Sequence, residues 1–365
     1  MTLNNKNNES EEISNKDPEI SSSSITMEKP AASASLVKNE RKVRKRDNGE
    51  YGADNITVLE GLEGVRKRPA MYIGSTGKKG FHHLAIECID NSIDEALARY
   101  GDLIQVRILE NGSIPIYDNG RGIPVEKKKK KKVSTLEVIF TSLHSGGKFD
   151  SKSYAISGGL HGVGLAVVNA CSEWAIITVW RNGRKYELKC GKGRIIDPLK
   201  EVPYEEDRDP KDSGTMINFF PDPKIFTSID AEHFAFDFEF LESHLRDLAY
   251  LNPIEIDLID EREFHKEEIN FLYEGGLNDF IKYINTTKKP IHDPIRFTDQ
   301  EEGVYVDVAF QYTETYQTII RSYVNNIHTE EGGTHLTGFK SAFTRCFNKY
   351  LKDNPSYKKN LQGKK

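Results

Sequence analysis

Apolar residues recur every three or four positions in three stretches of the chain, and this spacing predicts helices. The stretches are residues 59–68, 84–98 and 336–350, and the apolar run at 165–170 is expected to enter a further, buried helix. We expect the first helix to end at Arg68, because the residue before a proline disfavours helical backbone. On the second helix, a separate polar face carries Glu87, Asn91 and Glu95. Such a face is usually just exposed to water, but it can also serve a binding site.

Short apolar runs between turn residues predict strands. Residues 103–109 and 113–117 flank the turn at 110–112, so we expect them to pair as a hairpin that ends at Asp118. Three further strands are expected, at residues 254–259, 304–310 and 322–327.

The chain has 365 residues, enough for about two domains and a tail. Residues 1–50 are rich in serine and charge, and we expect a disordered tail there, because they cannot bury enough apolar surface to offset the entropy of ordering. One domain is expected over residues 51–252 and a second over 253–365. The basic cluster at 41–46 is interpreted as part of a solvated linker, with a phosphate- or DNA-binding arm as the alternative.

The formal net charge is −5, so any contact with DNA must come from a local basic patch. No apolar run approaches the ~18–20 residues of a membrane span. The N-terminus has no apolar signal core, and its acidic residues argue against an organelle transit peptide. The four cysteines are scattered without a Cys-x-x-Cys pair, which is typical of a reducing cytoplasm and of a protein without a zinc site.

Three polar motifs between Glu87 and Gly164 carry the candidate chemistry. Glu87 and Asn91 share one helix face, where a general base and a Mg²⁺ ligand could lie side by side. Asp118 begins Asp-Asn-Gly-Arg-Gly, a turn on which backbone can closely approach a flat ligand. Gly158 begins Gly-Gly-Leu-His-Gly-Val-Gly, whose N–H groups precede a helix and could bind phosphates. Each motif alone also fits a solvated helix face or a plain turn, but their order and closeness favour one nucleotide pocket.

The glycine-rich segment is neither of the two commonest phosphate-binding loops. No Gly-x-x-x-x-Gly-Lys-Ser/Thr occurs in the chain, and Gly162-Val-Gly164 lacks the third glycine of a dinucleotide fingerprint. Residues 142–157 contain few large apolar side chains and are expected to form a flexible lid over the phosphates. The six lysines at 127–132 repel one another, so we expect an exposed flexible loop there.

In this order the motifs resemble the ATP-binding fold shared by type II topoisomerases, Hsp90 chaperones, MutL repair proteins and histidine kinases. Longer matches resemble the DNA gyrase B family, with the family of the topoisomerase IV ATPase subunit (its E subunit) as the alternative. These matches lie at residues 65–74, 90–97, 143–149, 325–327 and 331–336, and the resemblance covers about residues 51–360. The chain departs from the family pattern at Ala70, where glycine is commonest, and at the six lysines.

The resemblance implies an α/β fold, more closely an α+β two-layer sandwich: a GHKL-type ATPase domain with a mixed sheet, followed by an incomplete, ribosomal-S5-like transducer domain. It implies that Glu87 activates the attacking water and that Asn91 holds Mg²⁺. Asp118 would accept the adenine amino proton beside Thr215, and Arg181 would border the pocket mouth. The residues that would wrap the triphosphate are Gly158, Gly159, Leu160, His161, Gly162, Val163 and Gly164. Three more would contact nucleotide: Lys148 at the phosphates, Tyr154 near the adenine, and Tyr51 on an arm that reaches the nucleotide of a partner copy.

The resemblance also implies ATP and Mg²⁺ as cofactors, and ATP hydrolysis that drives a change of DNA topology. The implied partners are a gyrase A-like cleavage subunit, double-stranded DNA and a second copy of the chain, in an A2B2 assembly. The chain ends before the family's loop whose lysine reaches the γ-phosphate, so an ATP-gated dimerisation module with little turnover is the alternative. A sensor histidine kinase would need a phosphoacceptor helix upstream, and the first 50 residues provide no such pattern.

Overall fold

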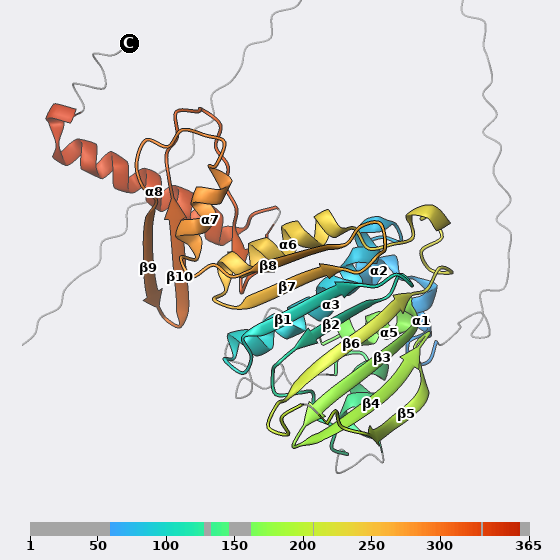
Figure 1. Ribbon diagram of the computed structural model, residues 1–365. Helices are drawn as coiled ribbons and strands as arrows, with labels where there is room; N and C mark the ends of the chain where they lie inside the picture. Colours follow the sequence, from blue (N-terminus) through green and yellow to red (C-terminus); the bar gives the residue numbers. More distant parts are fainter. Residues whose placement is uncertain (1–58, 128–132, 146–161, 207, 330, 358–365) are drawn as a thin grey trace, which may run out of the picture. The chain divides into compact units, whose positions relative to one another are not determined.

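The computed structural model describes residues 59–127, 133–145, 162–206, 208–329 and 331–357 (Figure 1). The chain divides into two units, residues 1–56 and 57–365, and all described residues belong to the second. The expected tail and most of the expected lysine loop and lid therefore lie outside the described residues. No helix in the described ranges is both long and apolar enough to cross a bilayer.

An eight-stranded sheet organises most of the described chain, in the order β5-β4-β3-β6-β2-β1-β7-β8. Its strands are β1 (Leu103–Ile108), β2 (Ile114–Asp118), β3 (Ser172–Arg181), β4 (Arg184–Gly191), β5 (Arg194–Val202), β6 (Gly214–Pro221), β7 (Glu255–Asp260) and β8 (Glu267–Phe271). The β1–β7 pair is parallel and the other neighbours are antiparallel, so the sheet is mixed, as expected. The hairpin expected around residues 110–112 is confirmed as the β1–β2 pair.

Helices cover one face of this sheet and make the second layer (Figure 1). They are α1 (Glu63–Lys67), α2 (Ala70–Ile73), α3 (Lys78–Leu97), α4 (Thr135–Thr141), α5 (Gly164–Cys171) and α6 (Phe238–Leu251), with a short 3₁₀ turn, η3, at Ala231–His233. The core lies between the layers. In α3, Leu84, Ala85, Cys88 and Ile89 are almost fully buried, and all of residues 165–171 in α5 are buried. The two-layer α/β class is thus confirmed.

The central helix α3 begins at Lys78, six residues before the expected start at residue 84. Phe81 and His82 are buried in this first part of the helix. The His82 ring accepts a hydrogen bond from the backbone amide of Asp237 at 2.8 Å, beside the N-terminus of α6. A buried histidine interrupts the apolar pattern, and for this reason the sequence pattern missed the first turns of α3.

Helix α4 was not expected, although the sequence carries its signal. Ser134 and Glu137 form a reciprocal capping box, with the Glu137 amide donating to the Ser134 hydroxyl at 3.1 Å. This motif satisfies two backbone donors at a helix N-terminus and so defines where α4 begins.

The C-terminal elements are α7 (Leu277–Ile284), β9 (Ile295–Glu301), β10 (Val304–Phe310), β11 (Tyr323–Val324), β12 (Ile327–His328) and α8 (Thr334–Asp353). The expected strand at 304–310 and the expected helix at 336–350 are confirmed as β10 and a section of α8. The single strand expected at 322–327 is wrong. Asn325 and Asn326 have φ values of 49° and 66°, and they make a two-residue turn between β11 and β12.

The sheet continues past residue 252, where we expected the first domain to end. β7 pairs in parallel with β1 along its whole length, from Leu103 opposite Glu255 to Ile108 opposite Asp260, and β8 extends the same sheet. Parallel strands need a long connection, and α6 and the other elements between β1 and β7 supply it.

One ion pair fastens α1 to the sheet layer. Arg66 donates to the Ala170 carbonyl at 2.6 Å and to Oδ2 of Asp222 at 2.6 Å. The Asp222 side chain has no exposed surface. Burial acts to raise the pKa of Asp222, but hydrogen bonds from Arg66 and the Lys224 amide outweigh it and lower that pKa. Asp222 is therefore ionised and depends on Arg66 for its partner.

We predict that Arg66→Ala lowers the free energy of unfolding by about 3 kcal/mol, because it leaves a buried carboxylate without its cation. Urea unfolding measures this. The control is Arg184→Ala, which removes an exposed pair with Glu201 and should change stability little. Equal losses in the two variants would contradict the assignment.

Candidate functional site

A cavity of about 1660 Å³ lies between α3 and α6 and reaches the ends of β2 and β6. It brings together the predicted site residues that the structure describes: Glu87, Asn91, Asp118, Gly162, Val163, Gly164, Arg181 and Thr215. Residues 158–161, Lys148, Tyr154 and Tyr51 lie outside the described residues. The β11–β12 hairpin, which we did not expect at the site, contributes to the cavity wall.

Asp118 is the most buried carboxylate of the site, with 8% of its surface exposed. It is the last residue of β2 and lies opposite Thr215 of β6 in the antiparallel register. Ser92 donates to its Oδ2 at 3.1 Å, and the Gly120 amide donates to its Oδ1 at 3.0 Å. Burial raises the pKa of Asp118 to about 7, although these hydrogen bonds act in the opposite direction. The carboxyl group therefore titrates close to neutral pH.

The turn after Asp118 needs its glycines. Gly122 has φ of +72°, and a Cβ there would lie 2.7 Å from the Trp180 carbonyl oxygen. A Cβ on Gly120 would lie 2.8 Å from Oδ1 of Asp118. Arg181 holds the turn by donating to the carbonyls of Arg121 and Gly122 at 2.9 and 2.8 Å. Arg181 thus lines the cavity as expected and also fixes the backbone beside Asp118.

Arg121, within the same turn, faces outward from Asp118 toward α3. Its guanidinium donates to both carboxylate oxygens of Glu95 at 3.0 and 2.9 Å and lies 3.6 Å from the Tyr100 ring centre. The third residue of the polar α3 face therefore binds the turn, and all three residues of this face line the cavity.

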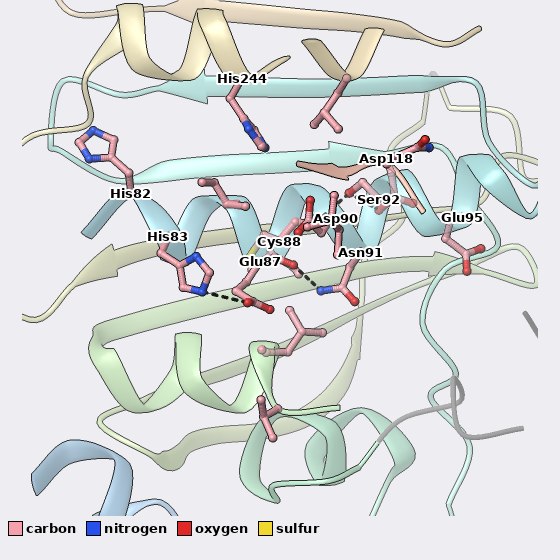
Figure 2. A pocket seen from close by; sticks show the side chains of 18 of the residues that line it. His82, His83, Glu87, Cys88, Asp90, Asn91, Ser92, Glu95, Asp118 and His244 are labelled. Atoms are coloured by element: carbon pink, nitrogen blue, oxygen red, sulfur yellow. Dashed lines mark hydrogen bonds and ion pairs between the residues drawn. The ribbon is translucent and has the colours of Figure 1, made fainter. Parts of the chain in front are cut away.

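Glu87 and Asn91 lie on the same side of α3, as their spacing predicted (Figure 2). The Asn91 amide nitrogen donates to the Glu87 carbonyl one turn earlier. Gly164, the first residue of α5, lies directly against the Glu87 side chain, because a Cβ there would be 1.9 Å from Oε2 of Glu87. The glycine-rich motif thus allows α5 to begin where the carboxylate lies.

The sequence interpretation missed His83 as the partner of Glu87. Nε2 of His83 lies 3.1 Å from Oε1 of Glu87, and this hydrogen bond raises the pKa of His83. The spacing of four residues on one helix was the available signal.

His244 on α6 is a second residue that the sequence interpretation missed. It lines the same cavity, and burial lowers its pKa to about 4 (Figure 2). Within the described ranges, its Nε2 atom has no hydrogen-bond partner. No sequence signal connected it to the site, because α6 is far from α3 along the chain.

Comparisons with known proteins show the family of this chain. Residues 76–224 match the family described as histidine kinase-, DNA gyrase B-, and HSP90-like ATPase, and residues 276–365 match the family described as DNA gyrase B. The B subunit of DNA gyrase from Haloferax volcanii is 51% identical over 84% of this chain and 47% of its own length. That of Treponema pallidum is 47% identical over 86% of this chain and 48% of its own length.

A solved structure is also similar, that of the 43K ATPase domain of Thermus thermophilus gyrase B in complex with an aminocoumarin. The similarity has a TM-score of 0.68 at 39% sequence identity, and it covers 80% of this chain and 73% of the other. The chain spans about half the length of the curated relatives reported above.

We predict that Asp118→Asn stabilises the fold more at pH 8 than at pH 5. A carboxyl whose pKa is raised on folding contributes stability below its unfolded pKa, and that contribution is lost as the pH rises through about 7. Replacing the carboxylate should therefore raise the free energy of unfolding at pH 8 by about 2–4 kcal/mol relative to pH 5. Unfolding by urea at the two pH values measures the difference.

The matched control is Asp222→Asn, at a buried aspartate whose pKa is lowered. A carboxyl whose pKa is lowered on folding is ionised at both pH values, so this variant should lose the same stability at pH 8 and at pH 5. Its loss should become smaller only below the ordinary aspartate pKa of 3.8. The same pH dependence in both variants would contradict the assigned environments.

Proposed function

The chain belongs to the DNA gyrase B family, and from this premise we propose that it binds and hydrolyses ATP within a type II DNA topoisomerase. The observation that carries the proposal is the single cavity that joins Asp118, at the end of β2, to Glu87 and Asn91 on α3. Asp118 provides a hydrogen-bond acceptor for a nucleobase in one part of the cavity. Glu87 and Asn91 provide a carboxylate and an amide in another part.

Asp118 would recognise the adenine ring. A buried carboxylate that accepts from Ser92 and from the amides of Gly120 and Thr215 keeps acceptor capacity for the amino group of adenine. Thr215 lies beside it, and its hydroxyl accepts from the Ile123 amide at 3.2 Å, which fixes the hydroxyl near the base. A flat ligand can approach here because Gly120 and Gly122 carry no side chains at these two positions of the turn.

Glu87 would act as the general base for the water that attacks the γ-phosphate. Its hydrogen bond to His83 and its contact with Gly164 hold the carboxylate in one place. Val163 and Gly164 begin α5, whose first N–H groups can bind phosphate oxygens. Removal of a proton from water and stabilisation of developing phosphate charge are the two requirements of this reaction.

The donors at the site suit Mg²⁺, which would supply positive charge to offset that of the phosphates. Mg²⁺ is usually held by one or two protein oxygens together with phosphates and water, and the Asn91 amide oxygen can supply one. Among the described residues no group of three or more His, Cys, Asp or Glu side chains could hold a metal ion by itself. Asn91 would therefore hold the ion only together with the nucleotide.

The wider activity is also proposed from the family. The partners would be a gyrase A-like cleavage subunit, double-stranded DNA and a second copy of this chain, and the location would be the cytoplasm. All four cysteines are free, which suits a reducing compartment. We propose that the transducer domain begins after β8, because the sheet ends at Phe271 and the second family match begins at residue 276.

We predict that Glu87→Gln keeps ATP affinity and lowers hydrolysis by about 10²-fold or more, because glutamine retains the shape but cannot accept the proton. Asn91→Ala should instead weaken Mg²⁺-dependent binding itself. Steady-state turnover and calorimetric nucleotide affinity separate the two effects. Wild-type turnover in Glu87→Gln would show that another group is the base.

We predict that a non-hydrolysable ATP analogue converts the chain from monomer to dimer, because Tyr51 would reach the partner's nucleotide. Deleting residues 1–60 should abolish the shift, whereas deleting 1–50 keeps Tyr51 and should preserve it. Analytical ultracentrifugation measures both. A dimer that forms equally without residues 1–60 would contradict a role for this arm.

A further inference from the structure

Ser92 lies one turn beyond Cys88 on α3, at the contact between the helix and the end of β2. It is 4% exposed and lines the cavity. Its hydroxyl lies 3.1 Å from Oδ2 of Asp118 and 3.4 Å from the Cys88 carbonyl oxygen. A hydroxyl has one proton to donate. Of the two possible acceptors, the Asp118 carboxylate is both the nearer and the stronger one. Ser92 therefore donates to Asp118.

The charges around Asp118 do not by themselves hold it ionised. Glu95 on α3 acts against the carboxylate form, and Arg121 is engaged with Glu95. Tyr117 on β2 adds no charge at pH 7, because burial raises its pKa above the ordinary tyrosine value of 10.0. From β6 the neighbour is Thr215, an uncharged residue. Among the described residues, the groups that favour the carboxylate are thus hydrogen-bond donors, and Ser92 is the one that donates from a side chain.

We propose that Ser92 is a positioning residue that keeps Asp118 a hydrogen-bond acceptor and thereby selects adenine over purines with a 6-oxo group. The proposal rests on the proposed function. An ionised Asp118 accepts from the 6-amino group of adenine, whereas a protonated carboxyl group would donate to a 6-oxo group. The proton on Asp118 therefore decides which purine edge matches the site.

The hydroxyl also fixes the direction in which Asp118 faces the cavity. With Oδ1 bound by the Gly120 amide and Oδ2 by Ser92, rotation of the carboxylate would break both hydrogen bonds. The remaining lone pairs therefore point in defined directions.

The test compares Ser92→Ala with the wild-type chain. Removing a donor to a charged group should raise the pKa of Asp118 by about one unit. Carboxyl ¹³C NMR of the nucleotide-free protein, assigned through Asp118→Asn, measures that pKa directly. ADP affinity measured from pH 6 to pH 9 should fall about 5-fold at pH 7 and less than about 2-fold at pH 9. The preference for ADP over IDP should fall most at low pH.

The matched control is Ser113→Ala, which removes another buried serine hydroxyl, one bonded to Asn111 away from the cavity. It should leave the Asp118 pKa and the pH profile unchanged. An unchanged pKa in Ser92→Ala, or an affinity loss independent of pH, would overturn the inference and leave ATP binding intact. A wild-type chain that binds no ADP would overturn the proposed function and the purine selection with it. The NMR titration would then still decide whether Ser92 holds the charge.

Discussion

The burial of one carboxylate, Asp118, is the constraint on which the rest of the site depends. Moving a carboxylate out of water costs several kcal/mol unless donors meet it. The structure meets that requirement from α3 with Ser92, and from the turn with the Gly120 amide. The Gly120 amide lies in the same turn as Asp118, whereas the Ser92 donor requires the end of β2 to lie against α3. The hydrogen bond from Ser92 therefore joins the sheet and helix layers where the ligand would bind.

Polar residues on different faces of helix α3 make different contacts, and the helical periodicity determines which residues share a face. His83, Glu87 and Asn91 follow one another at intervals of four, and the first two are bonded through their side chains. Ser92 is turned toward Asp118, and Glu95 toward Arg121. The helix packs its apolar side against the core, and this packing fixes the positions from which the backbone presents these polar groups. The geometry of the cavity therefore follows the rigidity of α3.

Sequence patterns were sufficient where local spacing determines contact. The interval between Glu87 and Asn91 defined a helix face, and the turn at 110–112 defined the hairpin that ends at Asp118. Sequence patterns failed where two segments that are distant in sequence come into contact only in the folded structure. His244 reaches the cavity from α6, and no local pattern links it to α3. The parallel pairing of β7 with β1 was missed because it joins segments about 150 residues apart. At Asn325 and Asn326, two positive φ angles converted an expected strand into a hairpin.

The β11–β12 hairpin contributes to the cavity wall from a part of the sequence far from α3. Asn326 donates to the Asn252 side chain at 2.6 Å, and Tyr323 donates to Asp247 on α6 at 3.2 Å. Any ligand that touches both the hairpin and α3 gains affinity only while the hairpin stays docked. By thermodynamic reciprocity, the same ligand strengthens the docking by an equal factor. A ligand that touched both would therefore couple occupancy of the cavity to the docking of the β11–β12 hairpin.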